Sequence, residues 1–264
     1  MLKSGFSVST RCVVLVAFAA VAAIEAPAVA SAEGPATLHI AFVGDSMADG
    51  LWGAMFRRLG KDKCLADKVK LIRRAKNGTG LTRLDQYNWV DEVGAIATDP
   101  GADLFVGSFG VNDRQSIVDV DKKRTEFGGP DYDGRYEGIV EDVVHSALSH
   151  GSSVLVMGLP VMLDAAANAD AAAKNKLFAD AVAHVASPSA VYVAPWTSQP
   201  PPDVYKPFLP NAKQTLVQVR APDGVHFTTA GYDMVMDAFF PAIMDSLKQR
   251  GRDVAAECEQ MGAK

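Results

Sequence analysis

The chain has 264 residues, of which 48% are hydrophobic and 22% are charged, and its formal net charge is −5. This length and hydrophobic content suffice for one α/β domain with a sizeable core, so no second folded domain is required. The negative net charge gives no overall bias toward nucleic acid or anionic membranes, and we expect neither as a partner.

The N-terminal segment has the pattern of a secretion signal. Two positive charges, Lys3 and Arg11, precede an uncharged apolar stretch over residues 13–24. An A-x-A cleavage site follows this stretch. Because this stretch is short for a membrane span, an uncleaved anchor is the weaker alternative. The sequence therefore predicts a signal peptide over residues 1–32. The mature protein, residues 33–264, is expected to be secreted or periplasmic and not inserted in a membrane.

Two cysteines remain once the signal is removed, Cys64 and Cys258. In an oxidising compartment two cysteines favour a disulfide, and with only two of them the connectivity is fixed. The sequence does not show whether their Cα atoms come close enough, so the bond stays a prediction. No cysteine or histidine spacing is typical of a metal site, and we expect neither a metal nor a cofactor.

The first element of the mature chain carries the most informative motif. Residues 38–43 indicate a buried strand, because they are apolar except for His39. Residues 44–47 (Gly-Asp-Ser-Met) break this pattern, and a helix-compatible run follows over 51–59. A strand, a tight glycine turn and a helix place one side chain at the C-terminal edge of a parallel sheet. That side chain is Ser46, which suits a nucleophile; the alternative is that Gly-Asp-Ser is only a turn and helix cap.

The rest of the chain alternates predicted strands with predicted helices. This alternation favours a parallel sheet covered by helices on both faces, whose strand ends meet at one edge. A polar, glycine-bearing segment and a proline-rich one indicate a long surface loop or lid and an irregular excursion, and the charged tail after Gly251 is expected to fray. The expected strands are 69–73, 103–108, 153–159 and 190–194; the helices are 87–97, 135–150, 164–185 and 229–250; the loop and excursion are 118–132 and 195–210.

Four loops would meet at that edge, and together they carry the groups needed for nucleophilic catalysis. His226, on the turn before the last helix, is the best base for Ser46, and Asp223 can hold its ring. Asp-x-x-His also occurs in ordinary loops, so this pair alone also suits a structural turn. Donors for a developing oxyanion are the backbone N–H groups of Ser46 and Gly80 and the side-chain amide of Asn112. The alternatives are a plain turn at Gly80 and an Asx-turn at Asn112.

Three polar residues follow the two oxyanion loops and are candidates for substrate binding: Arg83, Arg114 and Gln115. An arginine at such a place can hold a carboxylate or a sugar hydroxyl of the substrate. The alternative is that both arginines are solvated at the surface.

In their order along the chain, these motifs resemble the blocks of the SGNH/GDSL hydrolase superfamily. The matching stretches are Gly44-Asp45-Ser46, Asn77-Gly-Thr-Gly80, Gly110-Val-Asn112 and Asp223-Gly-Val-His226, and they span almost all of the mature chain. Thr79-Gly-Leu81 and Asn112-Asp-Arg-Gln115 also resemble a secreted bacterial subgroup. The resemblance implies an α/β fold, a flavodoxin-like three-layer α/β/α sandwich with a five-stranded parallel sheet. It also implies that Ser46, Gly80, Asn112 and His226 are the family's four named residues, with Asp223 as the acid before the histidine.

These observations favour a secreted serine esterase that forms an acyl-enzyme on Ser46. The expected substrate carries an acyl ester, such as an O-acetyl group, on a carbohydrate or cell-envelope molecule. One alternative is an O-acyltransferase acting on envelope polysaccharide through the same acyl-enzyme. The other is a non-catalytic envelope-binding protein, which would be expected to lack one of Ser46, Asn112 and His226. The sequence leaves open the natural substrate, the acyl length, the choice between hydrolysis and transfer, and the oligomeric state.

Overall fold

Five parallel strands form the central sheet of the structure, a computed structural model that describes residues 36–196 and 204–262. The order across the sheet is β2-β1-β3-β6-β7, and every neighbouring pair is parallel. The predicted signal peptide, residues 1–32, lies outside the described residues. The strands are β1 (Leu38–Gly44), β2 (Val69–Ala75), β3 (Leu104–Ser108), β6 (Ser153–Met157) and β7 (Ala190–Val193).

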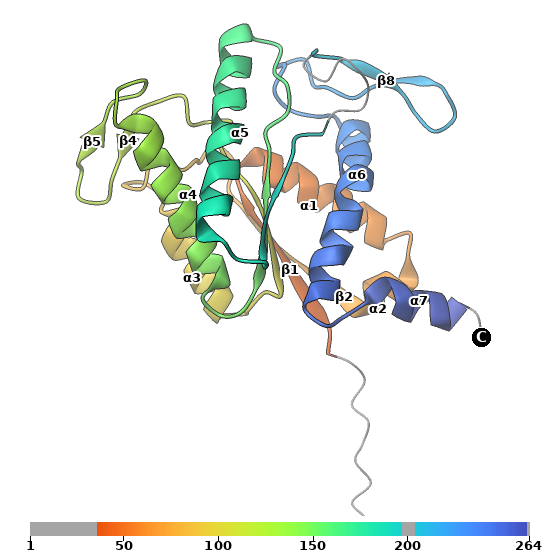
Figure 1. Ribbon diagram of the computed structural model, residues 1–264. Helices are drawn as coiled ribbons and strands as arrows, with labels where there is room; N and C mark the ends of the chain where they lie inside the picture. Colours follow the sequence, from red (N-terminus) through yellow and green to blue (C-terminus); the bar gives the residue numbers. More distant parts are fainter. Residues whose placement is uncertain (1–35, 197–203, 263–264) are drawn as a thin grey trace, which may run out of the picture. The chain divides into compact units, whose positions relative to one another are not determined.

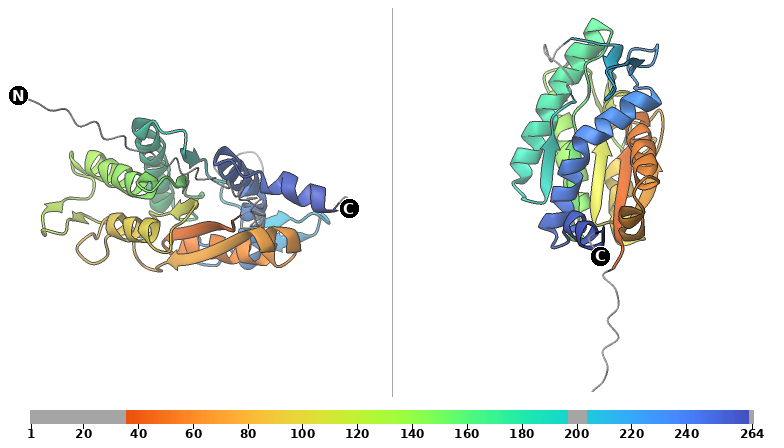
Figure 2. Two further views of the ribbon diagram at one scale, coloured as in Figure 1. Left: turned by 90° about the horizontal axis from the view of Figure 1, so that it is seen from below. Right: turned by 90° about the vertical axis from the view of Figure 1, so that its right-hand side faces the viewer.

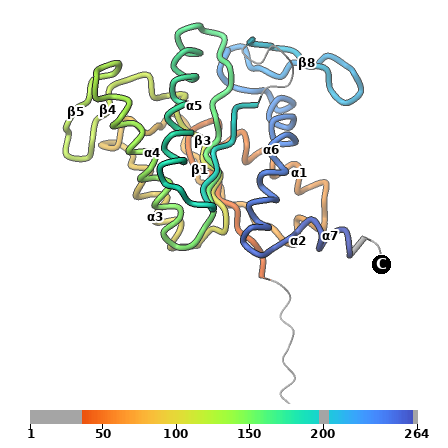
Figure 3. Tube along the Cα trace, viewed as in Figure 1, coloured from red at the N-terminus to blue at the C-terminus, as the bar shows by residue number. Residues whose placement is uncertain are grey.

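Helices cover both faces of this sheet (Figure 1, Figure 2). One layer contains α3 (Trp89–Thr98), α4 (Tyr132–Leu148) and α5 (Ala165–Val185); the other contains α1 (Ser46–Leu59) and α6 (Thr229–Gln249). Figure 3 shows β1 and β3 between the two layers. The three-layer α/β/α sandwich with a five-stranded parallel sheet is therefore confirmed.

The side chains of β1 show why the strand is apolar at nearly every position. Ile40 and Phe42 pack with α1 and α6, whereas Ala41 and Val43 pack with the layer of α3, α4 and α5. Successive side chains of a strand point to opposite faces, so a sheet covered on both sides buries all of them. The pattern predicted this strand correctly, and it now positions the Gly-Asp-Ser turn that follows.

Two predicted boundaries near the site are corrected by the structure. The first helix begins at Ser46, not at residue 51, because the Asp45 side chain accepts the Met47 N–H at 2.8 Å and caps it. The predicted loop 118–132 contains a two-stranded antiparallel ribbon, β4 (Ile117–Val118) and β5 (Arg124–Thr125), and ends where α4 begins. Backbone hydrogen bonds hold this ribbon. Its sequence lacks the alternation of apolar and polar residues by which a strand can be predicted.

The predicted fraying of the C-terminal tail is wrong. The tail forms α7 (Val254–Gly262), which packs against a short helix that the sequence did not suggest, α2 (Lys63–Lys68). A disulfide joins Cys64 to Cys258, with 5.7 Å between their Cα atoms. Lys68 Nζ also lies 2.7 Å from Glu257 Oε2. The disulfide is the one predicted from the cysteine count, whereas the α2–α7 packing joins segments far apart in the sequence and had no local signal in the tail.

The described part of the proline-rich excursion also contains regular structure. A second antiparallel ribbon, β8 (Phe208–Pro210) and β9 (Leu216–Gln218), follows the segment 197–203, which lies outside the described residues. Among the described helices, none is both long enough and apolar enough to cross a membrane. From Ala36 onward the chain forms one structural unit.

Candidate active site

Ser46 lies at the point where the strand order of the sheet reverses. The chain passes from β1 to β2 on one side of it and then to β3 on the other, and ligands bind at such switch points. The turn before Ser46 is tight. Gly44 has φ +127°, and a Cβ on it would lie 1.8 Å from the Ser108 carbonyl oxygen, so only glycine fits. Ser46 is thus the first residue of α1, at the end of the helix that favours negative charge.

Ser46, His226 and Asp223 form one hydrogen-bonded chain. Ser46 Oγ lies 2.6 Å from His226 Nε2, and His226 Nδ1 lies 2.8 Å from Asp223 Oδ2. The other carboxylate oxygen, Asp223 Oδ1, accepts the N–H groups of Val225 and His226, both at 2.9 Å. This is the geometry of a nucleophile, a base and a group that orients the base.

The charge of Asp223 determines which histidine nitrogen can act as the base. Partial burial raises the pKa of this carboxyl, but the hydrogen bonds from Val225, His226 and the imidazole outweigh it and lower the pKa to about 2. Asp223 is therefore ionised at neutral pH. An ionised carboxylate holds a proton on Nδ1, which leaves Nε2 with a lone pair directed at Ser46.

Arg220 holds the turn that carries His226. Its side chain is 5% exposed, and its guanidinium donates to the carbonyls of Val161 at 2.7 Å and Val225 at 2.8 Å. A weaker bond reaches the His226 carbonyl at 3.4 Å. Burial lowers the pKa of Arg220 from its usual value. An arginine that bonds carbonyls instead of a carboxylate gave no signal in the sequence, so its part in the site was missed.

The predicted oxyanion donors come together on neighbouring loops. Asn112 Nδ2 donates one hydrogen to the Thr79 carbonyl at 2.8 Å, which places Asn112 beside the Gly80 loop and leaves its second hydrogen. The N–H of Val111 donates to the Asp45 carboxyl at 3.3 Å and ties the Asn112 loop to the turn before the nucleophile. Within the described residues the backbone N–H groups of Ser46 and Gly80 make no hydrogen bond, so they are free to donate to a substrate.

Asp113 joins the loop of Asn112 to the loop of Gly80 by hydrogen bonds. Its fully buried carboxylate accepts the Leu81 N–H at 3.0 Å, the Thr82 hydroxyl at 3.0 Å and the Tyr136 hydroxyl at 2.8 Å. A Cβ at Gly80 would lie 1.8 Å from Asp113 Oδ1, which explains why glycine occupies that position. The position of Asp113 directly after Asn112 is the signal by which the sequence could have revealed it.

Asp45, next to Ser46, is also fully buried. Burial raises the pKa of its carboxyl to about 8, despite the hydrogen bond from Met47, and the nearby charge of Asp113 adds to the rise. Burial thus favours the protonated, neutral form of this carboxyl over what is usual for an aspartate. A neutral side chain here leaves less negative charge close to Ser46, where it would oppose a developing oxyanion.

The three predicted substrate-binding residues lie apart from the pocket beside Ser46. Arg83 is paired with Asp85, at 2.9 Å and 3.0 Å. Arg114 is exposed, and its contact with an acid is long, 3.6 Å. Gln115 Nε2 donates to the Asn112 carbonyl at 2.8 Å, so it contacts one of the predicted oxyanion donors. Substrate binding by these residues stays a prediction.

An open pocket of about 410 Å³ lies beside Ser46 and His226. Apart from Ser46 and His226, the sequence did not indicate the residues that line it, because they come from separate parts of the chain. The other polar and aromatic side chains of the lining are Asp49, Trp52 and Arg57 of α1, Arg73 of β2, Phe227 of the turn before α6, and Thr229 and Tyr232 of α6.

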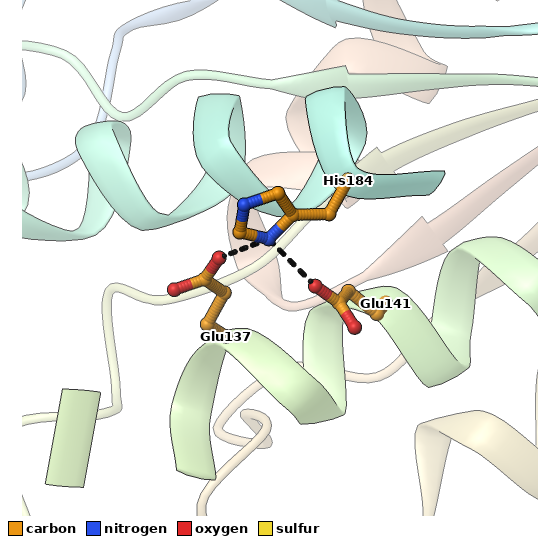
Figure 4. A group of neighbouring side chains, drawn as sticks. All are labelled: Glu137, Glu141 and His184. Carbon is orange, nitrogen blue, oxygen red and sulfur yellow. Dashed lines mark hydrogen bonds and ion pairs between the residues drawn. The ribbon is translucent and has the colours of Figure 1, made fainter. Parts of the chain in front are cut away.

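A second histidine–carboxylate group lies between α4 and α5. Nδ1 of His184 is 2.8 Å from Glu137 Oε1 and 3.1 Å from Glu141 Oε1 (Figure 4). The three ligand atoms lie within 4.8 Å of one another, a spacing that a metal ion can bridge. No described hydroxyl or thiol contacts the His184 ring near these carboxylates, which sets this group apart from the one at Ser46.

Comparison with solved structures finds the same fold in several esterases. A carbohydrate esterase family 3 protein from Talaromyces cellulolyticus has a TM-score of 0.55 at 12% identity, over 81% of this chain and 99% of that one. A catalytic mutant of an acetylxylan esterase from Geobacillus stearothermophilus has 0.53 at 15%, over 78% and 94%. The acetyl xylan esterase AlAXEase has 0.51 at 18%, over 78% and 100%. At these identities the likeness is one of fold, and it agrees with the three-layer sandwich described above.

At the level of sequence the comparisons give one positive match. No protein with a curated description matches the chain. The family model described as "Protein of unknown function (DUF459)" matches residues 39–242. This match covers most of the sandwich and all of the residues that surround Ser46. The chain belongs to the DUF459 family.

Proposed function

We propose that the protein is a serine esterase that hydrolyses a short acyl ester of a carbohydrate. The observation that carries this proposal is the chain Ser46–His226–Asp223, with 2.6 Å and 2.8 Å between the bonded atoms, at the switch point of the sheet. A structural turn would explain Asp223 and His226, but it would not require a serine hydroxyl aimed at the second ring nitrogen.

In the proposed reaction Nε2 of His226 takes the proton of Ser46 as Oγ attacks the ester carbonyl carbon. Asp223 stabilises the imidazolium that forms. The carbonyl oxygen becomes negative and is stabilised by the N–H groups of Ser46 and Gly80 and the second amide hydrogen of Asn112. The bond to the alcohol oxygen then breaks, and His226 gives its proton to that oxygen. Water, deprotonated by His226, then attacks the acyl carbon, the bond from that carbon to Ser46 Oγ breaks, and His226 returns the proton to Oγ as the acid leaves.

One observation supports a short acyl group on a carbohydrate. The solved structures that share the fold include a carbohydrate esterase and acetyl xylan esterases. Their substrates belong to those proteins; for this chain they support a substrate class.

We propose that the reaction takes place outside the cytoplasm. The predicted signal over residues 1–32 supports this location. The disulfide between Cys64 and Cys258 supports it independently, because such bonds persist in oxidising compartments.

The test is turnover of p-nitrophenyl esters of increasing acyl length by the mature protein, beside the Ser46→Ala variant. We expect the acetyl ester to be the best substrate and the variant to be inactive. A fluorophosphonate should label the parent on Ser46 and leave the variant unlabelled. A parent that neither hydrolyses any ester nor reacts with the fluorophosphonate would refute the assignment.

A further inference from the structure

The pocket beside Ser46 lies on the side of the site where an alcohol must leave. Its lining includes Ser46 and His226 but neither Gly80 nor Asn112, the donors for the carbonyl oxygen. The leaving oxygen receives its proton from Nε2 of His226, so it has to lie near that nitrogen. The group attached to that oxygen would therefore occupy this pocket.

Two arginines line the pocket, and each is already paired with a carboxylate. Arg73 donates from Nε to Asp49 Oδ1 at 2.7 Å and from Nη2 to Oδ2 at 2.9 Å. Arg57 donates from Nε and Nη2 to Asp233 Oδ1, at 2.9 Å and 2.6 Å. Two positive charges against two negative charges leave no net charge. An anionic ligand would find no uncompensated cation there, and it would approach Asp49 as closely as Arg73.

The Arg73–Asp49 pair still offers hydrogen bonds. Nη1 of Arg73 has no partner among the described residues, and carboxylate oxygens accept more than one bond. Arg73 is 55% exposed on its side chain, so these groups are accessible. A rigid set of donors and acceptors without net charge suits hydroxyl groups, each of which both donates and accepts.

Trp52 holds Arg73 in this position. The guanidinium carbon lies 4.8 Å from the centre of the indole ring, and that ring stacks on Phe56 with 5.3 Å between centroids. The arginine is thus fixed by a carboxylate and by an aromatic surface. A side chain held in one orientation loses little entropy when it binds a ligand, which favours selective recognition.

We propose that this pocket binds a neutral sugar that carries the ester, and that it selects this sugar over acidic sugars. We call it the Arg73 pocket, after the side chains that would recognise the sugar: Asp49, Trp52, Arg57 and Arg73. The Arg73–Asp49 pair bonds the hydroxyls of the sugar. The inference rests on the proposed function, because the place of the leaving alcohol was deduced from the role of His226 as its proton donor. It goes further by naming the part of the substrate that is recognised and the residues that recognise it.

The kinetic test uses acetylated xylo-oligosaccharide and p-nitrophenyl acetate, whose leaving group has no hydroxyls to bond. In Arg73→Gln we expect the ratio of kcat/KM on the sugar ester to kcat/KM on the small ester to fall by about 10- to 100-fold. Arg74→Gln is the matched control, since Arg74 is the next residue of β2, is exposed and does not line the pocket. An equal ratio in parent and Arg73→Gln would overturn the proposal.

The binding test does not depend on turnover. Calorimetry with Ser46→Ala should detect binding of a neutral xylo-oligosaccharide and little or no binding of an oligogalacturonate. Adding Arg73→Gln to this variant should abolish binding of the neutral sugar. Stronger binding of the acidic sugar, or no binding of the neutral one, would overturn the proposal. If the parent hydrolyses no ester, the proposed function fails, and neutral binding lost in Arg73→Gln would still support the pocket.

Discussion

Two histidines of this protein lie against carboxylates, and their surroundings differ in one decisive way. His226 uses its two nitrogens on different partners, Nδ1 on Asp223 at 2.8 Å and Nε2 on Ser46 at 2.6 Å. His184 directs a single nitrogen, Nδ1, at both Glu137 and Glu141 (Figure 4). A general base needs one nitrogen held and the other aimed at a proton that will move. A histidine–carboxylate pair alone therefore does not make a catalytic group.

The difference follows from where each histidine lies in the fold. His226 is on a turn at the edge of the sheet where β1 and β3 end, so loops with other chemistry surround it. His184 is in the last turn of α5 and faces α4, and its side chain is 66% exposed. Residues four apart on a helix share a face, which is why Glu137 and Glu141 both reach it. This second group links two helices.

The largest expected effect separates the two groups by their nucleophile. Ser46→Ala removes one oxygen at the surface of a turn, so the fold should persist while kcat falls by about 10³- to 10⁶-fold. His184→Gln, measured beside it, should keep the parent rate. Comparable turnover by Ser46→Ala and the parent on p-nitrophenyl acetate would show that Ser46 is not the nucleophile.

Asp223→Asn tests the group that holds the base. An amide cannot stabilise the imidazolium, and its NH₂ group favours the wrong tautomer, so we expect kcat to fall by about 10²- to 10⁴-fold. Glu141→Gln makes the same chemical change beside His184 and is the control. If the two substitutions reduced the rate equally, the distinction between the histidines would be lost.

Asn112→Ala tests the donors that the His184 group lacks. Removing one oxyanion donor typically costs about 10²- to 10³-fold in kcat, with a smaller change in KM. The loss of the bond to the Thr79 carbonyl also loosens the Gly80 loop, which would be visible as a lower Tm. An unchanged kcat with a lower Tm would give Asn112 a structural role only.

The pH dependence should follow His226 and not His184. Only the neutral imidazole accepts the Ser46 proton, so kcat/KM should fall about tenfold per pH unit on the acid side. Asp223 does not set this limb, because its pKa is lowered to about 2. A carboxyl whose pKa is lowered by folding stabilises the fold fully at pH values above its pKa in the unfolded chain. This contribution is lost as the pH falls from about 4 to about 2. A profile that shifts in His184→Gln would contradict this assignment.

The smallest expected effect concerns the second group itself. His184→Gln and Glu137→Gln break a pair in which the histidine is exposed and the carboxylate is partly buried, so each should change the free energy of unfolding by less than about 1 kcal/mol. Thermal unfolding at pH 6 and pH 8 measures this. A much larger loss in either variant would mean that the group holds α4 and α5 together more firmly than its exposure suggests.

Local patterns in the sequence were enough to predict the Gly-Asp-Ser motif and the sheet and helices around it. The apolar run of β1, the glycine turn and the alternation of strands with helices are local patterns, and a parallel sheet brings its strand ends to one edge whatever else the chain does. The order of four motifs then indicated Ser46, Asn112 and His226. Such signals survive in a sequence because neighbours along the chain produce them.

Which residues surround that motif depends instead on how distant parts of the chain pack. Asp49 and Arg73 are paired because β2 lies beside β1 and α1 packs near both; Arg220 and Asp113 hold turns whose partners come from other loops. The cysteine count predicted the bond between Cys64 and Cys258, but only the fold shows that it joins α2 to α7 and orders a tail that was expected to fray. Each of these contacts depends on how distant segments pack, and a side chain carries no local mark of a partner that only the folded chain supplies.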